Sequence, residues 1–299
     1  MLQFLLATLT GLMSTAFLVL HTLFLTLPLY LLFILKCISP NHRWRDACQT
    51  GLNYIGDSWT ATNKRWIFWL YGKDIEVSGL PKLNRNDWHF IICNHQSWTD
   101  ILILQSIFSK KIPFIKFFTK DVLKYFALLG IGFLVFEFPT MKRYPAKILA
   151  KKPHLRGQDL QKTIKLCQRY TQQPSSILNF IEGTRFTQFK KAQQSSPYQH
   201  LLIPKTGGFA ITIQAMQPKI KKIINVVIAY PNGTNNFWRF LCGRIRPIKV
   251  KIEVIKIPEH LLNGNYLQDN AYKSQLKAWL ASIWRNNDQL LSSIQASSK

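Results

Sequence analysis

The chain has 299 residues, 47% of them hydrophobic and 18% charged, which excludes a disordered or low-complexity protein and fits one α/β domain plus an extension. Lys and Arg number 39 against 14 Asp and Glu, and the resulting charge of +25 indicates an anionic partner such as nucleic acid, an anionic membrane, or acidic small molecules and carriers. The five cysteines lack Cys-x-x-Cys spacing, which argues against a disulfide framework or zinc site and favours a reducing compartment.

The first predicted element, residues 1–38, is an apolar membrane segment. Residues 2–35 contain no Lys, Arg, Asp or Glu. As one helix they would extend about 51 Å, against roughly 30 Å of hydrocarbon in a bilayer. The segment must therefore tilt, break or fold back, with Pro28 and the His21–Thr22 pair as candidate break points, so a single spanning helix and a helical hairpin both fit. A signal peptide, which would need a basic start, and a buried core helix are the alternatives.

The second predicted element is an interfacial or connecting helix over residues 39–72. Its tryptophans are mixed with basic side chains, a pattern that suits the boundary between lipid tails and headgroups. A packed connecting helix explains the same pattern. The basic residues that follow the apolar run also predict that the remainder of the chain faces the cytoplasm.

From residue 73 onward strand and helix patterns alternate, which predicts a single mixed-sheet α/β domain over residues 73–299. We expect strands at 75–77, 88–93, 113–117, 131–136, 177–181, 223–229 and 248–254. We expect helices at 100–107, at 159–170 and near the C-terminus, around 272–284.

A polar turn, Asn-His-Gln-Ser-Trp-Thr-Asp at 94–100, follows the strand expected at 88–93. A histidine at such a turn lies at the end of the sheet, where α/β proteins form their sites. If His95 lies in the turn and Asp100 in the first turn of the helix, the carboxylate can fix the imidazole tautomer. The other ring nitrogen is then a general base. A capping box from Ser97 to Asp100 explains the same residues without chemistry.

A second polar turn follows the strand expected at 177–181 and consists of Glu182, Gly183, Thr184 and Arg185. A glycine turn followed by a hydroxyl and a guanidinium suits an oxyanion, and an arginine binds phosphate through two hydrogen bonds. Glu182 is expected to hold the turn or to orient a substrate hydroxyl. The alternative is a strand-end turn with a surface arginine.

Together these turns resemble the glycerolipid acyltransferases, which include lysophosphatidic acid and other lysophospholipid acyltransferases. That family carries Asn-His-x-Ser-x-x-Asp and, about 80 residues later, Glu-Gly-Thr-Arg after an apolar strand; here 87 residues separate His95 from Glu182. Phe-Pro-Thr-Met-Lys-Arg-Tyr at 138–144, Glu-Gly-Thr-Arg-Phe-Thr at 182–187 and Pro-Lys-Thr-Gly-Gly at 204–208 are most similar to a bacterial inner-membrane branch that itself resembles the lysocardiolipin acyltransferases.

The resemblance implies a membrane-bound enzyme of the bacterial inner membrane whose catalytic domain faces the cytoplasm. His95, oriented by Asp100, would deprotonate the hydroxyl of a lysophospholipid, foremost lysophosphatidic acid. The oxygen would attack acyl-CoA or an acidic acyl carrier protein without an acyl-enzyme. Lys142 or Arg143, together with Arg185, would bind the acceptor's phosphate. The sequence shows no metal-ligand cluster, so we expect no metal or prosthetic group, with the acyl donor as a co-substrate, and we expect no nucleic-acid partner.

Two other classes of function fit parts of the sequence. The charge also fits a membrane-anchored basic protein that binds anionic lipid or nucleic acid without catalysis. A hydrolase could use the same His–Asp pair, but a serine hydrolase would need a Gly-x-Ser-x-Gly elbow, which the sequence lacks.

Overall fold

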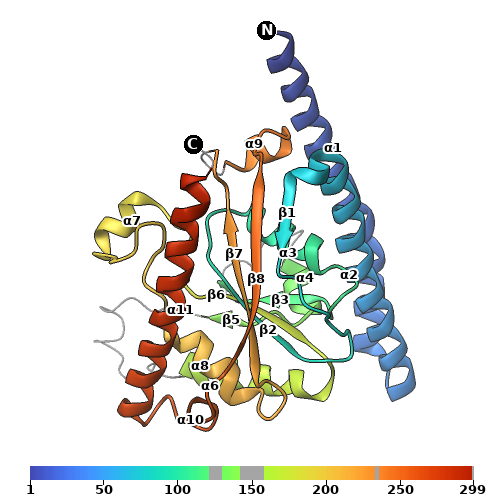
Figure 1. Ribbon diagram of the computed structural model, residues 1–299. Coiled ribbons are helices and arrows are strands. Elements are labelled where there is room, and N and C mark those ends of the chain that lie inside the picture. The colour runs from blue at the N-terminus through green and yellow to red at the C-terminus, as the bar shows by residue number, and fades with distance from the viewer. Residues whose placement is uncertain (121–129, 142–157, 233–235, 298–299) are drawn as a thin grey trace.

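The computed structural model describes residues 1–120, 130–141, 158–232 and 236–297. At its centre lies a six-stranded mixed sheet (Figure 1). Its strands are β1 (Ile75–Ser78), β2 (His89–Cys93), β3 (Ile115–Phe117), β6 (Ser176–Phe180), β7 (Lys222–Ala229) and β8 (Ile248–Lys256). Their order is β1-β8-β7-β2-β6-β3, and only the β7–β8 pair is antiparallel. The predicted mixed-sheet α/β fold is confirmed.

Helices cover both faces of this sheet. The helices of this part of the chain are α3 (Thr99–Phe108), α6 (Gln158–Arg169), α7 (Gln188–Gln193), α8 (Thr206–Ala215), α9 (Phe237–Leu241), α10 (Glu259–Leu262) and α11 (Asn270–Ala296), with 3-10 turns η1 (Gly72–Asp74) and η4 (Tyr170–Gln172). A small second sheet pairs β4 (Thr119–Lys120) with β5 (Thr140–Met141) beside α4 (Gly130–Val135). The chain begins with two long helices, α1 (Leu2–Ile38) and α2 (His42–Tyr71).

The central strands β2 and β7 are buried on both faces, so their sequences are nearly continuous apolar runs and do not alternate between apolar and polar residues. On β2, Phe90 and Ile92 face a core shared with α6, α8 and α11, whereas Ile91 and Cys93 face a second core shared with α2, α3 and α9. Figure 1 shows α11 in red on one side of the sheet and α1 and α2 in blue on the other. This packing of helices on both faces fixes the ends of β2 and β6, where the polar turns lie, and the end of β7 beside them.

The helices α1 and α2 pack side by side as an antiparallel hairpin (Figure 1). Lys36 Nζ donates to Gln49 Oε1 at 2.6 Å near the turn, and Trp66 Nε1 donates to Ser14 Oγ at 3.3 Å farther along. The helix α1 continues through Pro28, so neither candidate break point interrupts it; the missing N–H of a proline costs one backbone hydrogen bond, and the flanking turns remain helical. The chain reverses instead after Ile38.

Length and composition make α1 long and apolar enough to cross a membrane. Its most apolar 18-residue window has a mean hydropathy of 2.3, and only 6% of that window is buried within the protein. In the first third of the helix, a Cβ added to Gly11 would lie 2.6 Å from Cys242 Sγ, so α1 passes very close to the end of α9. Most of α1 therefore presents apolar surface outward, typical of a helix in lipid, while Gly11, Ser14 and Phe17 lie on the side that packs against the domain.

The helix α2 has two different faces. Ile67, Leu70 and Tyr71 are buried in the core, whereas Trp44 and Trp69 are exposed. Buried residues continue back along the helix as far as Leu52 and Cys48, so α2 is a packed connecting helix over most of its length, with exposed aromatic side chains on its other face. The interfacial position predicted for it stays a prediction.

One predicted strand is wrong. Residues 131–136 were expected to be extended, but Gly130–Val135 forms the helix α4. A short run that is apolar at every position carries no period that separates strand from helix. The helical form, closed by Glu137 at φ 53°, brings Phe133 and Phe138 to within 5.2 Å of each other and both against Phe117.

Candidate active site

The first polar turn begins where Asn94 joins β2 to β7. Its Oδ1 accepts the backbone N–H of Ile228 at 2.8 Å, and its Nδ2 donates to the carbonyl of Ile228 at 2.9 Å. A buried amide that satisfies both groups of a neighbouring strand is fixed in position. Asn94 therefore sets the point at which the chain leaves the sheet and His95 enters the turn.

The structure brings His95 and Asp100 together. His95 Nδ1 lies 2.9 Å from Asp100 Oδ2, and the Asp100 side chain is fully buried. The same oxygen accepts the backbone N–H groups of Gln96 at 2.6 Å and Ser97 at 2.8 Å. The bond to Ser97 is one half of a capping box, so the capping and orienting interpretations hold together rather than competing.

The pairing decides which imidazole nitrogen faces a substrate. Because a carboxylate only accepts, Nδ1 carries the proton and Nε2 is the basic nitrogen. The imidazole stacks on Phe180 at a centroid distance of 4.0 Å and 18° between planes, and 14% of the His95 side chain is exposed. The ring is therefore held in one orientation with limited access from outside.

Glu182 fastens the second polar turn to the first. It is fully buried; its Oε1 accepts the backbone N–H of His95 at 2.9 Å, and its Oε2 accepts that of Leu202 at 3.0 Å. The carbonyl of His95 in turn accepts the N–H of Phe186 at 2.7 Å. The two motifs, 87 residues apart in the chain, thus share backbone hydrogen bonds at His95 itself.

Burial raises the pKa of Glu182 to about 8, against the opposing pull of the two N–H groups that it accepts. The negative charge of Asp100 raises this pKa further, and Lys190 lowers it. The first expectation for Glu182, that it holds the turn, describes its contacts in the structure.

The rest of the second turn presents a cation at the same edge of the sheet. Gly183 has φ 70°, a left-handed conformation that glycine adopts without strain. Lys190 Nζ donates to Thr184 Oγ1 at 2.8 Å and to the carbonyl of Arg185 at 3.0 Å. The guanidinium of Arg185 is exposed and lies 5.4 Å from the ring centroid of Trp98, which follows Ser97 in the first turn. An anion at this edge would meet Arg185 next to His95.

Tyr230 is a site residue that the sequence did not reveal. Its hydroxyl donates to Asp100 Oδ1 at 2.6 Å, from a position directly after β7. A tyrosine that follows a buried strand is common in protein cores, so the sequence around Tyr230 carries no special signal. Tyr230 meets Asp100 because β7 lies next to β2 in the sheet. Two other predicted residues, Lys142 and Arg143, lie outside the described residues.

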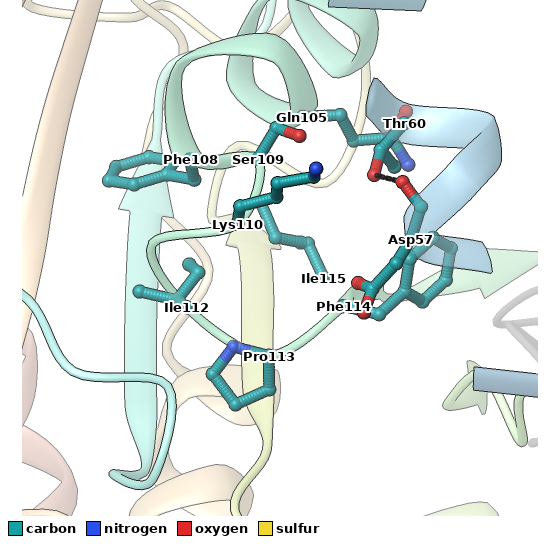
Figure 2. A pocket seen from close by; sticks show the side chains of 10 residues that line it. All are labelled: Asp57, Thr60, Gln105, Phe108, Ser109, Lys110, Ile112, Pro113, Phe114 and Ile115. Carbon is teal, nitrogen blue, oxygen red and sulfur yellow. Dashed lines mark hydrogen bonds between the residues drawn. The ribbon is translucent and has the colours of Figure 1, made fainter. Parts of the chain in front are cut away.

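A small cavity among the described residues lies away from this site. Figure 2 shows a cavity of about 10 Å³ between α2 and the segment that joins α3 to β3, lined by Asp57, Gln105 and Ser109 among others and by none of the residues above. Its volume corresponds to about one water molecule. In the same described part of the chain, no group of three His, Cys, Asp or Glu side chains is arranged to bind a metal.

Comparison with known proteins assigns the chain to a family. Residues 74–236, more than half of the chain, match the family model described as Acyltransferase. The chain belongs to this acyltransferase family. The matched segment contains both polar turns and Tyr230, so the residues described above lie within the part of the chain that matches the family.

Two relatives of this acyltransferase-family chain are similar over most of its length. An uncharacterised acyltransferase of Saccharomyces cerevisiae is 25% identical over 71% of this chain and 60% of its own length. A probable 1-acyl-sn-glycerol-3-phosphate acyltransferase of Arabidopsis thaliana is 24% identical over 80% and 62%. The chain thus spans about three fifths of the length of these curated relatives. Among solved structures, the 1-acyl-sn-glycerophosphate acyltransferase PlsC of Thermotoga maritima covers 91% of this chain and 97% of its own at 14% identity, with a TM-score of 0.47.

Proposed function

We propose that this protein transfers a fatty acyl chain from acyl-CoA or acyl carrier protein to the free hydroxyl of a lysophospholipid, foremost lysophosphatidic acid, to give phosphatidic acid. The observation that carries the proposal is the buried Asp100 carboxylate 2.9 Å from His95 Nδ1, beside the Glu182–Arg185 turn. Membership of the acyltransferase family supports the reaction class. The name of the Arabidopsis relative supports the acceptor.

In this mechanism His95 is the general base. Nε2 takes the proton of the acceptor hydroxyl while the oxygen forms a bond to the thioester carbonyl carbon. The tetrahedral intermediate then expels the thiolate, which takes the proton from the imidazolium. The Asp100 carboxylate stabilises the imidazolium between the two steps. No acyl-enzyme forms, and backbone donors of the second polar turn or of the start of α3 would stabilise the oxyanion.

Substrate binding follows from charge. The exposed Arg185 would bind the acceptor's phosphate at the edge of the sheet where His95 lies, with Lys142 or Arg143 as a second cation. The net charge of +25 suits CoA phosphates or an acidic carrier protein. The reaction as written needs no metal ion or prosthetic group.

The proposed setting is the bacterial inner membrane, with the catalytic domain on the cytoplasmic side. The apolar surface of α1 and the exposed tryptophans of α2 suit insertion at a lipid boundary. Basic residues near an anionic leaflet each contribute about 1 kcal/mol of attraction. The acceptor is a membrane lipid, so a membrane position supplies it directly.

The test is an acceptor and donor panel. Membranes containing the protein receive labelled acyl-CoA or labelled acyl carrier protein with lysophosphatidic acid or one of several other lysophospholipids. We expect labelled phosphatidic acid as the main product. Label that appears in another phospholipid would reassign the acceptor. Salt-sensitive binding to nucleic acid or anionic vesicles with no acyl transfer from either donor would instead support the non-catalytic alternative.

A further inference from the structure

The two carboxylate oxygens of Asp100 have different numbers of hydrogen-bond donors. Oδ2 accepts three donors, from His95, Gln96 and Ser97, whereas Oδ1 accepts the hydroxyl of Tyr230 at 2.6 Å. Asp100 is fully buried, and a buried carboxylate must have its oxygens satisfied. Tyr230 therefore supplies the hydrogen bond that satisfies Oδ1, the oxygen that does not face His95.

Tyr230 reaches Asp100 because of the sheet order and not because of sequence proximity. The two residues are 130 positions apart. The strand β7 pairs in parallel with β2, so the chain leaving β7 arrives at the same edge as the turn leaving β2. The Tyr230–Asp100 bond therefore ties the first polar turn to the end of β7 on one side of β2, and the Glu182–His95 bond ties the same turn to the end of β6 on the other side.

The hydroxyl of Tyr230 stays a donor across the working pH range. Burial, followed by the negative charge of Asp100, raises the pKa of Tyr230 well above its usual value. The other titratable groups nearby are Cys93 on β2, Tyr71 on α2 and Glu182 after β6, with Lys190 on α7 acting on Glu182. Burial also raises the pKa of the Cys93 thiol, so that group stays neutral.

We propose that Tyr230 is a positioning residue for the reaction, one that holds the Asp100 carboxylate in place and draws part of its charge away from His95. This inference rests on the proposed general-base role of His95. Without the hydroxyl, Oδ1 loses its donor, and more of the negative charge is directed at Nδ1–H. The imidazolium is then stabilised too strongly, which slows the return of its proton to the leaving thiolate, and the carboxylate is held through Oδ2 alone.

The experiment compares Tyr230→Phe with Tyr272→Phe in the full chain. Tyr272 is a matched control because its buried hydroxyl also donates one hydrogen bond, to the carbonyl of Leu261 at 2.9 Å, in the other core. We expect kcat of Tyr230→Phe to fall about 10- to 100-fold, the range for a hydrogen bond to a charged group. The acid limb of its pH–rate profile should move to higher pH, with KM nearly unchanged, while Tyr272→Phe keeps both values.

A second variant separates positioning from packing. If Tyr230 acts through Asp100, then Tyr230→Phe added to Asp100→Asn should lower kcat no further, because the interaction is already lost. Additive losses, or an unmoved pH profile, would overturn the inference and leave Tyr230 as a packing residue. A fully active His95→Ala would overturn the proposed function instead, and the two failures are distinguishable in one set of assays.

Discussion

Replacing Asp100 by Asn removes the charge of the side chain but keeps its size and an oxygen acceptor. Nδ1 of His95 and Oδ2 of Asp100 are 2.9 Å apart, which places the centres of the imidazolium and carboxylate charges about 4 Å apart. At an effective dielectric constant of about 20, two unit charges at that distance interact by about 4 kcal/mol. Since the imidazolium exists only as the reaction proceeds, that energy is lost from the transition state, and kcat should fall about 1000-fold.

The assay is steady-state acyl transfer with saturating donor and acceptor, together with the melting temperature of each variant in detergent. Asp269→Asn is the matched control, because Asp269 also caps a helix, accepting the N–H of Tyr272 at 3.0 Å at the start of α11. It should keep full activity. A loss below about 10-fold for Asp100→Asn, with the melting temperature unchanged, would refute an imidazolium stabilised by Asp100 and leave it a cap.

Three further predictions concern stability. Glu182 has a pKa of about 8 when folded and a usual value of 4.5, so the folded protein binds more protons between these values, and the free energy of unfolding should fall as pH rises from roughly 4.5 to 8. Glu182→Gln should flatten this slope in denaturant titrations at several pH values. Gly183→Ala forces alanine to φ 70° and should cost about 1–2 kcal/mol, seen as a lower melting temperature than for Gly132→Ala, where the added Cβ meets open space. Asn94→Ala leaves the buried N–H of Ile228 without its side-chain partner, while the carbonyl of Ile228 keeps only Gln96 Nε2 as a side-chain donor, at 3.2 Å. The free energy of unfolding should fall by about 1–3 kcal/mol; an unchanged denaturation midpoint would show that the bridge is dispensable.

The two polar turns could be predicted because their signals are local. Five buried residues in β2 lead into the turn at His95, and β6, with four of its five residues buried, leads through Ile181 into Glu182. Strand ends of this kind share one edge of a parallel sheet, so the sequence alone indicates that the turns approach each other. The mixed-sheet fold follows from the same alternation of strand and helix patterns.

The remaining features depend on contacts that no local pattern records. Tyr230 meets Asp100 only because β7 lies next to β2, and strand order is a property of the whole chain. The helix α4 was predicted as a strand because an all-apolar run has no period; as a helix, it packs Phe133 against Phe117 of β3, a contact between segments that the local pattern does not contain. The uninterrupted α1 reflects its packing along α2, which Pro28 alone does not predict.

The measurement that tests the central claim most directly compares His95→Ala with His260→Ala in acyl transfer to lysophosphatidic acid. His260 is an exposed histidine on α10, so its replacement controls for the loss of an imidazole elsewhere. We predict that His260→Ala retains wild-type activity, whereas His95→Ala, folded and present at the same level, forms no phosphatidic acid above background. Equal activity of the two variants would contradict the account, because His95 would then be only part of a helix cap.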